Sequence, residues 1–163
     1  MIQQSFLAAI QPHRGMLIQI ASAWCAVRED RHDLIQDMLV ELWRAYPRYD
    51  PAKPFSTFMY RVALNVAISA SRSRSRRPVA AASFHDPGFD LAAADQDLAS
   101  GDDDLQALSE LLRRLEPVDR GLLLLYLAGH GQNEIAETLG ISVSNVSTRL
   151  HRLKLKLSQG AKP

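Results

Sequence analysis

The chain has little of what disulfide frameworks, metal centres and membrane proteins need. Cys25 is the only cysteine, so a disulfide within the chain is impossible. No Cys/His cluster has zinc spacing, and the five histidines form no nucleophile–base set. The longest apolar run, residues 122–128, is far too short to cross a bilayer, and the N-terminus lacks a signal-peptide pattern. We therefore expect a cytoplasmic protein without membrane insertion or a zinc site, and we expect Cys25 to be a buried thiol.

Strand signals are also nearly absent, whereas helical periodicity is frequent. Apolar residues at three- and four-residue spacing predict an all-α fold. The expected helices cover residues 3–26 (with a break or new start at Pro12), 31–45, 55–74, 105–115, 117–128, 132–139 and 143–158. In the 55–74 helix the positions expected to face inward are Met59, Val62, Val66 and Ala70. The intervening segment 46–54, with its Asp50-Pro51 turn signal, is expected to be a loop.

Charge is distributed unevenly along the sequence. Residues 1–77 hold 11 Lys/Arg and 6 Asp/Glu. Residues 78–112 hold no Lys/Arg and 8 Asp/Glu, and residues 113–163 hold 8 Lys/Arg and 4 Asp/Glu. Two basic blocks thus flank an acidic one, which favours polyanion binding at both ends of the chain. Residues 78–104 are rich in Ala, Asp, Gly and Pro, without sustained periodicity. We predict two small helical domains, 1–77 and 105–163, joined by a flexible acidic linker at 78–104.

The C-terminal segment has the pattern of a helix-turn-helix. Gly140 suits the left-handed backbone of a tight turn, and Ser142 is placed to cap a second helix. In that helix Val146, Leu150, Leu153 and Leu157 predict one buried stripe. The opposite face is expected to carry Asn145, Ser147, Thr148, Arg149, His151 and Arg152. Short hydrogen-bonding and cationic side chains of this kind read base edges and phosphates, so the pattern predicts DNA binding.

Two parts of the sequence together resemble a known family. Residues 33–37 (DLIQD), 42–43 (LW), 49–51 (YDP) and 55–65 (FSTFMYRVALN) are similar to the second conserved region of bacterial sigma factors. Residues 115–117 (LEP) and 121–157 are similar to region four of the small extracytoplasmic-function group of the sigma-70 family, which keeps only regions two and four. The resemblance covers residues 5–77 and 105–158. It implies a sigma factor, not itself an enzyme, that directs RNA polymerase to promoters, under an environmental or envelope stress signal. A protein of this kind is expected to need no metal, cofactor or small-molecule substrate.

The resemblance implies protein partners as well as DNA. Asp33, Leu34, Gln36 and Asp37 match positions that dock on the clamp coiled coil of core RNA polymerase. The three polar members share one helix edge, as a helix–helix contact requires, although an ordinary solvated face has the same pattern. The polymerase flap is a further contact in this family, and an anti-sigma protein is an expected partner.

The resemblance also places promoter opening in the first domain. A flipped base of the downstream (−10) element needs apolar walls and a few hydrogen-bonding groups. The residues of these types in the matching segment are Tyr49, Lys53, Phe55, Ser56, Thr57, Tyr60, Arg61 and Asn65, and Asn65 matches a family position. Phe58 stands where the family usually has Trp, and its role is either stacking or core packing. The arginines at 72, 74, 76 and 77 would attract phosphates or form a solvated helix end.

For the upstream (−35) element the resemblance implies reading by the second helix of the motif. The candidate DNA-binding residues are Ser144, Asn145, Ser147, Thr148, Arg149, His151 and Arg152, of which residues 147, 148, 151 and 152 occupy the family's reading positions. Arg152 is the best candidate for a bidentate contact to guanine. Arg149 would contact phosphate or pack locally, and Ser147 departs from the family's usual basic residue, which leaves the recognised sequence open.

Three other functions compete with this interpretation. A helix-turn-helix repressor or activator would form a homodimer, bind a palindromic site and need no polymerase. A hydrolase or nuclease would need a nucleophile–base set or a carboxylate metal site, and the sequence shows no such motif. A protein-only adaptor, such as an anti-sigma protein, is disfavoured by the two basic blocks.

Overall fold

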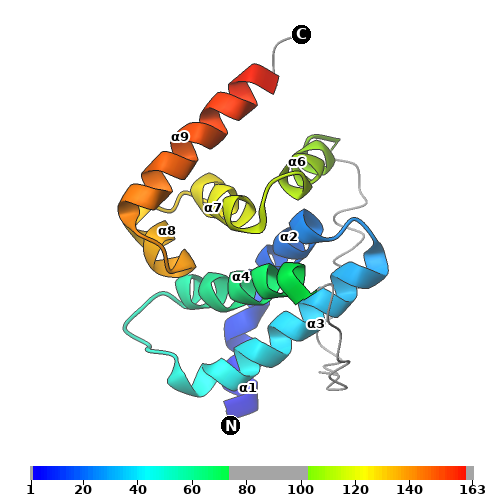
Figure 1. The fold of residues 1–163 in the computed structure, drawn as a ribbon. Coiled ribbons are helices and arrows are strands. Elements are labelled where there is room, and N and C mark those ends of the chain that lie inside the picture. The colour runs from blue at the N-terminus through cyan, green and yellow to red at the C-terminus, as the bar shows by residue number, and fades with distance from the viewer. Residues whose placement is uncertain (1, 74–102, 161–163) are drawn as a thin grey trace. The chain divides into compact units, whose positions relative to one another are not determined.

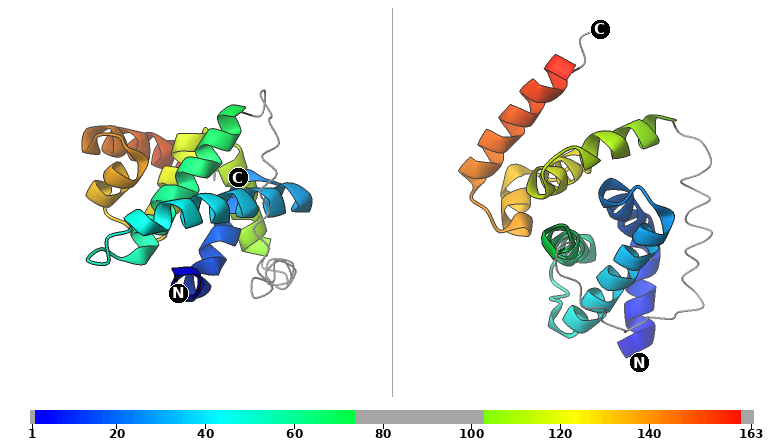
Figure 2. Two further views of the ribbon diagram at one scale, coloured as in Figure 1. Left: turned by 90° about the horizontal axis from the view of Figure 1, so that it is seen from below. Right: turned by 45° about the vertical axis from the view of Figure 1, so that its right-hand side comes forward.

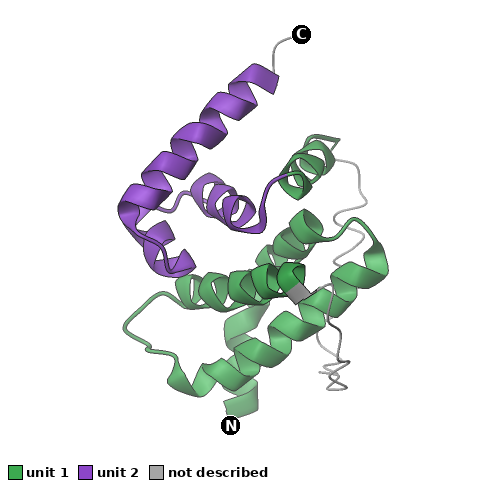
Figure 3. Ribbon diagram, viewed as in Figure 1, with its two compact units in different colours: residues 1–114 green, residues 115–163 purple. Residues whose placement is uncertain are grey.

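The computed structural model describes residues 2–73 and 103–160, and these residues are helices joined by short connections (Figure 1). No strand occurs in either described range, as the sequence predicted. The chain divides into two compact units, residues 1–114 and 115–163 (Figure 3). Residues 78–102 of the predicted acidic linker, and Arg74, Arg76 and Arg77, lie outside the described residues.

Unit 1 begins with a bent pair of helices. Helix α1 spans Ile2–Ile10, the 3-10 turn η1 spans Gln11–His13, and α2 spans Arg14–Trp24 (Figure 2). Proline has no backbone N–H and cannot continue the α-helix of the preceding turn, so the bend falls at Pro12 as predicted. Cys25, which follows α2 directly, is 6% exposed, which confirms the expected buried thiol.

The rest of unit 1 packs three helices around α2. Helix α3 spans Arg28–Ala45, the 3-10 turn η2 spans Tyr46–Arg48, α4 spans Phe55–Ser73 and α6 spans Asp103–Arg113. Helices α3 and α4 pack against each other and both pack on α2, which also contacts α6 (Figures 1 and 2). The largest side chains in this core that are fully buried are Phe6, Ile10, Leu17, Ile20, Met38, Leu39, Leu42, Met59, Leu64 and Leu112.

The inward face of α4 differs from the predicted stripe. Met59 is fully buried as expected, but Val62, Val66 and Ala70 are only half-buried. Their place in the core is taken by Ala63, Leu64 and Ala67, which are 0% exposed. Small residues at 63 and 67 let α2 and α3 approach α4 closely. The prediction had favoured the larger apolar side chains one position away.

Two hydrogen bonds tie distant parts of unit 1 together. Trp24 Nε1 donates to Ser71 Oγ at 2.8 Å, joining the end of α2 to the last turns of α4. Arg113 Nη1 donates to the carbonyl oxygen of Ser22 at 2.8 Å, joining α6 to α2. Helix α6, which begins two residues inside the predicted linker, therefore groups with unit 1, although residues 105–115 are predicted from the sequence to belong to the C-terminal domain.

Unit 2 contains three helices in its described part. Helix α7 spans Pro117–Leu127, α8 spans Gln132–Leu139 and α9 spans Val143–Gly160, and each contacts the other two. Proline at the first helical position suits the start of α7, because the N–H that it lacks has no partner there in any case. The buried residues at the centre of this unit are Leu122, Leu125, Ile135, Val146, Leu150 and Leu153.

Candidate nucleic-acid and polymerase interfaces

The turn between α8 and α9 is built as the sequence predicted. Gly140 has φ 68° and ψ 33°, the left-handed conformation that ends a helix. The N–H of Ile141 then reaches back to the carbonyl oxygen of Ala136 at 3.1 Å, which satisfies the end of α8. Ser142 Oγ accepts from the backbone N–H of Asn145 at 3.1 Å and so caps α9. These local bonds set the angle at which α9 leaves the turn.

Helix α9 has one buried stripe and one exposed polar face. Val146, Leu150 and Leu153 are buried, and Leu157 is half-buried, in agreement with the prediction. The exposed residues of the predicted reading set are Ser144, Ser147, Thr148, His151 and Arg152. Thr148 Oγ1 donates to the backbone oxygen of Ser144 at 3.0 Å, so its hydroxyl oxygen keeps only acceptor capacity toward a ligand. This face offers an Arg and a His among small hydroxyl side chains, a combination suited to a major groove.

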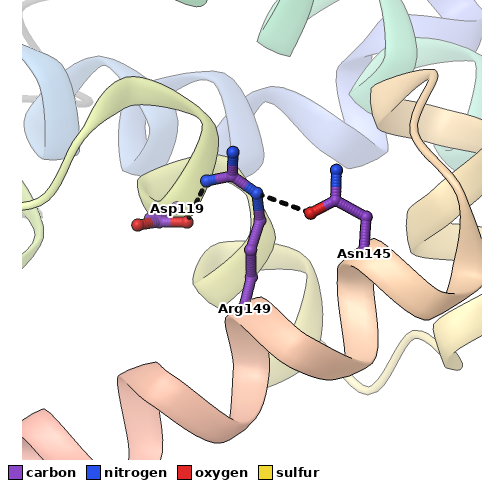
Figure 4. A network of polar contacts seen from close by, with 3 residues as sticks. All are labelled: Asp119, Asn145 and Arg149. Carbon is purple, nitrogen blue, oxygen red and sulfur yellow. Dashed lines mark hydrogen bonds and ion pairs between the residues drawn. The ribbon is translucent and has the colours of Figure 1, made fainter.

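Asn145 and Arg149 were predicted on that exposed face, and the structure corrects this. Both are half-buried at the edge of the stripe. Arg149 Nη1 donates to Asp119 Oδ1 at 2.7 Å, and Arg149 Nε donates to Asn145 Oδ1 at 2.9 Å (Figure 4). The side chains of Arg149 and Asp119 are only 23% and 13% exposed. The carboxylate on α7, which the sequence analysis did not single out, therefore draws the guanidinium inward.

The loop before α4 is held by its own hydrogen bonds. Asp50 Oδ1 accepts from the N–H of Ala52 at 3.0 Å, and the backbone oxygen of Asp50 accepts from Lys53 N at 3.0 Å. Tyr49 Oη donates to the backbone oxygen of Lys53 at 2.7 Å, which closes the loop on itself. An Asx-type turn of this kind needs no partner from elsewhere in the fold. The loop is therefore ordered before any ligand arrives.

A continuous aromatic cluster surrounds this loop. Tyr49 contacts Phe55 and Phe58 with ring centroids 5.2 Å apart in each pair, and it stacks on Tyr46 at 6.2 Å. Phe55 and Phe58 lie 5.7 Å apart. Phe6 extends the cluster inward with an edge contact to Tyr46 at 5.2 Å. Phe58 thus belongs to a half-buried aromatic group that adjoins the core and is not sealed within it.

The polar residues predicted around this cluster lie along α4. Thr57, Arg61 and Asn65 recur every four residues and so share one face, on which Arg61 and Asn65 are exposed. Ser56 and Tyr60 are half-buried, and burial raises the pKa of the Tyr60 hydroxyl above its ordinary value. Exposed Lys53 and this polar row therefore flank the aromatic surface.

On α3 the three polar docking residues that were predicted to share one edge are not equally exposed. Asp33 and Asp37 are exposed, whereas Leu34 is 5% exposed and belongs to the core. Gln36 is half-buried, and its Oε1 is buried without a hydrogen-bond partner in the described part of the protein. A partner on this face would therefore meet two carboxylates first, with Leu34 contributing packing only.

Comparison with known proteins assigns both parts of the chain. Residues 9–77 match sigma-70 region 2, and residues 105–157 match sigma-70 region 4. The sigma factor CnrH of Cupriavidus metallidurans is 27% identical over 164 residues, covering 96% of this chain and 86% of CnrH. The extracytoplasmic-function sigma factor SigG of Mycobacterium tuberculosis is 25% identical over 175 residues, covering 93% of this chain and 47% of SigG.

The chain belongs to the sigma-70 family. Its relatives place it in the extracytoplasmic-function group, as the motifs had predicted. The region 2 match takes in α2, α3, the aromatic loop and α4, and the region 4 match takes in α6 and the helix-turn-helix.

Two solved structures share the fold of this sigma factor. CnrH in complex with the cytosolic domain of CnrY has a TM-score of 0.58 at 27% identity, covering 96% of this chain and 87% of that one. RpoE in complex with the anti-sigma factor NepR, from Bartonella quintana, has a TM-score of 0.66 at 18% identity, covering 96% and 94%. Within the described residues, no helix is both long and apolar enough for a membrane span.

Proposed function

We propose that this sigma factor binds core RNA polymerase, reads a downstream promoter element with unit 1 and an upstream element with unit 2, and acts under an environmental or envelope stress signal. The observation that carries the proposal is the match to regions 2 and 4 in one chain, with a polar recognition helix and an ordered aromatic loop. The polymerase supplies the chemistry, and this chain supplies the choice of start site.

The decisive experiment combines the purified chain with core RNA polymerase. Co-elution, followed by initiation at new and defined start sites on a pool of genomic fragments, is the expected result, and the start sites yield the promoter sequence. Failure of the folded chain to bind core enzyme would overturn the proposal. DNA binding by the free chain as a homodimer on a palindromic site would instead favour the helix-turn-helix regulator.

For polymerase docking we propose the exposed carboxylates of α3. Asp33 and Asp37 lie one turn apart and would face cationic groups of the clamp coiled coil. The double substitution Asp33→Ala with Asp37→Ala is expected to weaken core binding and to leave the helix content unchanged. Glu110→Ala, at an exposed position of α6, is the matched control for loss of a surface charge and should bind core enzyme like the unsubstituted chain.

For promoter opening we propose that the aromatic surface holds an unstacked base. Tyr49, Phe55 and Phe58 are already in mutual contact, so a base that stacks on them does not have to order the loop first. Stacking on an aromatic side chain contributes about 1–3 kcal/mol per base. Replacing Phe55 by Ala should therefore slow open-complex formation on duplex promoters, and a promoter premelted around the start site should recover most of the rate.

For the upstream element we propose that Arg152 contacts guanine from the exposed face of α9. A bidentate Arg–guanine contact discriminates by about 1–3 kcal/mol against another base. Arg152→Ala should remove the preference for guanine at one position of the upstream element. Gln159→Ala, an exposed neutral position near the end of the same helix, is the control and should retain the full preference.

For regulation we propose that an anti-sigma protein holds this chain away from core polymerase. The support is that the relative CnrH was solved with the cytosolic domain of CnrY. Isolating the chain from its own cells before stress, identifying the protein bound to it and competing that protein against core enzyme tests the proposal. Recovery of the chain only as free protein or bound to polymerase would contradict it.

A further inference from the structure

The network of Asp119, Arg149 and Asn145 crosses two helices inside unit 2. Asp119 lies in the first turn of α7, and Arg149 and Asn145 lie one turn apart on α9 (Figure 4). Two different nitrogens of the same guanidinium are used, Nη1 toward Asp119 and Nε toward Asn145. Because the guanidinium is planar and rigid, fixing Nη1 on the carboxylate also fixes the direction of the Nε–H bond.

This arrangement determines which end of the Asn145 amide is presented outward. A guanidinium nitrogen can only donate, so the atom of Asn145 that faces it must be the acceptor, Oδ1. The amide nitrogen Nδ2 points away from Arg149 in Figure 4, and it has no hydrogen-bond partner among the described residues. Asn145 therefore offers a ligand two N–H donors, with its carbonyl already engaged.

Asn145 lies where a recognition helix meets DNA. It is in the first turn of α9, between the exposed residues Ser144 and Thr148 and on the same side as Arg152. The first turns of the second helix of a helix-turn-helix contact base edges in the major groove. A free asparagine there would pair with adenine, accepting from N6 and donating to N7. Arg149 occupies one of the two lone pairs of Oδ1 and turns the carbonyl toward itself, so that bidentate contact is weakened.

We propose that Asp119 and Arg149 are positioning residues that turn the amide N–H groups of Asn145 outward, so that Asn145 reads the upstream promoter element chiefly as a hydrogen-bond donor. Guanine presents two adjacent acceptors, O6 and N7, and thymine presents O4, whereas adenine presents its N7 acceptor beside the N6 donor and cytosine presents only a donor. Asn145 then prefers guanine or thymine to cytosine, and it prefers guanine to adenine because the N6 amino group of adenine faces the amide with a second donor. This inference rests on the proposed promoter recognition by unit 2.

The network itself is tested on the free full-length chain. In isotope-labelled protein, NMR should show a slowly exchanging Arg149 Nε–H and a single ordered Asn145 side-chain amide. Asp119→Ala should speed exchange of that Nε–H at least fivefold, and Asp119→Glu should restore much of the protection. Fast exchange of the Arg149 Nε–H in the unsubstituted chain would contradict the network, whatever the polymerase experiments show.

The reading role is tested with holoenzyme on a promoter library whose upstream element is randomised. The unsubstituted chain should prefer guanine or thymine at one position by about fivefold, the effect of one hydrogen bond. Asn145→Ala should abolish the preference at that position alone, and Asp119→Ala should relax the same position while Asp119→Glu restores it. Gln159→Ala should change nothing.

Three results would overturn the proposal. The first is a requirement for adenine or cytosine at the position that Asn145→Ala affects. The second is a uniform loss of binding in Asn145→Ala without any change in base preference, which would indicate a phosphate contact. The third is an unchanged preference in Asp119→Ala. Failure to form holoenzyme would instead contradict the sigma-factor proposal, and the NMR result would still show whether the network of Asp119, Arg149 and Asn145 exists in the free chain.

Discussion

Replacing Gly140 by alanine tests whether backbone conformation at the turn sustains the helix-turn-helix. Gly140 has φ 68°, and a Cβ added there would meet no atom within 4 Å. Any destabilisation must therefore come from the backbone and not from a clash. The left-handed conformation costs an L-residue roughly 1–2 kcal/mol. Alanine also restricts the unfolded chain, which returns roughly 0.4–1 kcal/mol. The net loss of unfolding free energy is thus about 1 kcal/mol.

Hydrogen exchange of the full-length chain measures this loss where it occurs. A change of about 1 kcal/mol corresponds to roughly fivefold faster exchange of the α8 and α9 amides. Gly140→Asn should lose less unfolding free energy than Gly140→Ala, because asparagine tolerates the left-handed region better than alanine. Gly160→Ala is the control in the same unit, since Gly160 lies at the end of α9 with no atom within 4 Å of an added Cβ and without a positive φ. The reasoning is refuted if Gly140→Ala exchanges like the unsubstituted chain, or if asparagine is as harmful as alanine.

Three further changes address unit 1. Met59→Ala leaves a cavity at a fully buried site and should lower the free energy of unfolding by about 2–5 kcal/mol. Urea titration followed by tryptophan fluorescence measures this loss, and a loss below about 1 kcal/mol would contradict the packing described. Tyr49→Phe removes the hydroxyl that donates to the Lys53 carbonyl, so it should cost about 0.5–1.5 kcal/mol and raise exchange in the loop, whereas unchanged loop exchange would show that the bond does not hold it. Burial raises the pKa of the Tyr60 hydroxyl in the folded state, so its contribution to stability is present at neutral pH and is lost as pH rises from the unfolded-state pKa through the folded-state pKa. Tyr60→Phe should therefore reduce the loss of unfolding free energy at alkaline pH, and an unaltered pH profile of stability would contradict this.

The elements of the fold were largely predictable because their signals are local. The break at Pro12, the left-handed turn at Gly140 and the Ser142 cap each depend on the chemistry of one residue and its near neighbours. The buried stripe of α9 followed from helical spacing in the same way. The predicted helix ends agree with the structure to within a few residues, which is the range over which helix termini vary.

The side of α4 that faces the core could not be predicted from periodicity alone. Two adjacent stripes of that helix carry apolar residues, and the stripe predicted to face inward contains Val62 and Val66. The structure buries Ala63 and Ala67 instead, because α2 and α3 need small side chains where they approach α4.

The sequence by itself determined the helical class, the helix-turn-helix and the membership in the sigma-70 family, because each follows from residue types at short or fixed spacing. Only the tertiary structure decided which members of the reading set face outward. Arg149 and Asn145 carry the chemistry of DNA-contacting residues, and a carboxylate thirty positions earlier holds them at the edge of the buried stripe. An ion pair between separate helices depends on how those helices pack, and no local pattern in the sequence encodes that distance.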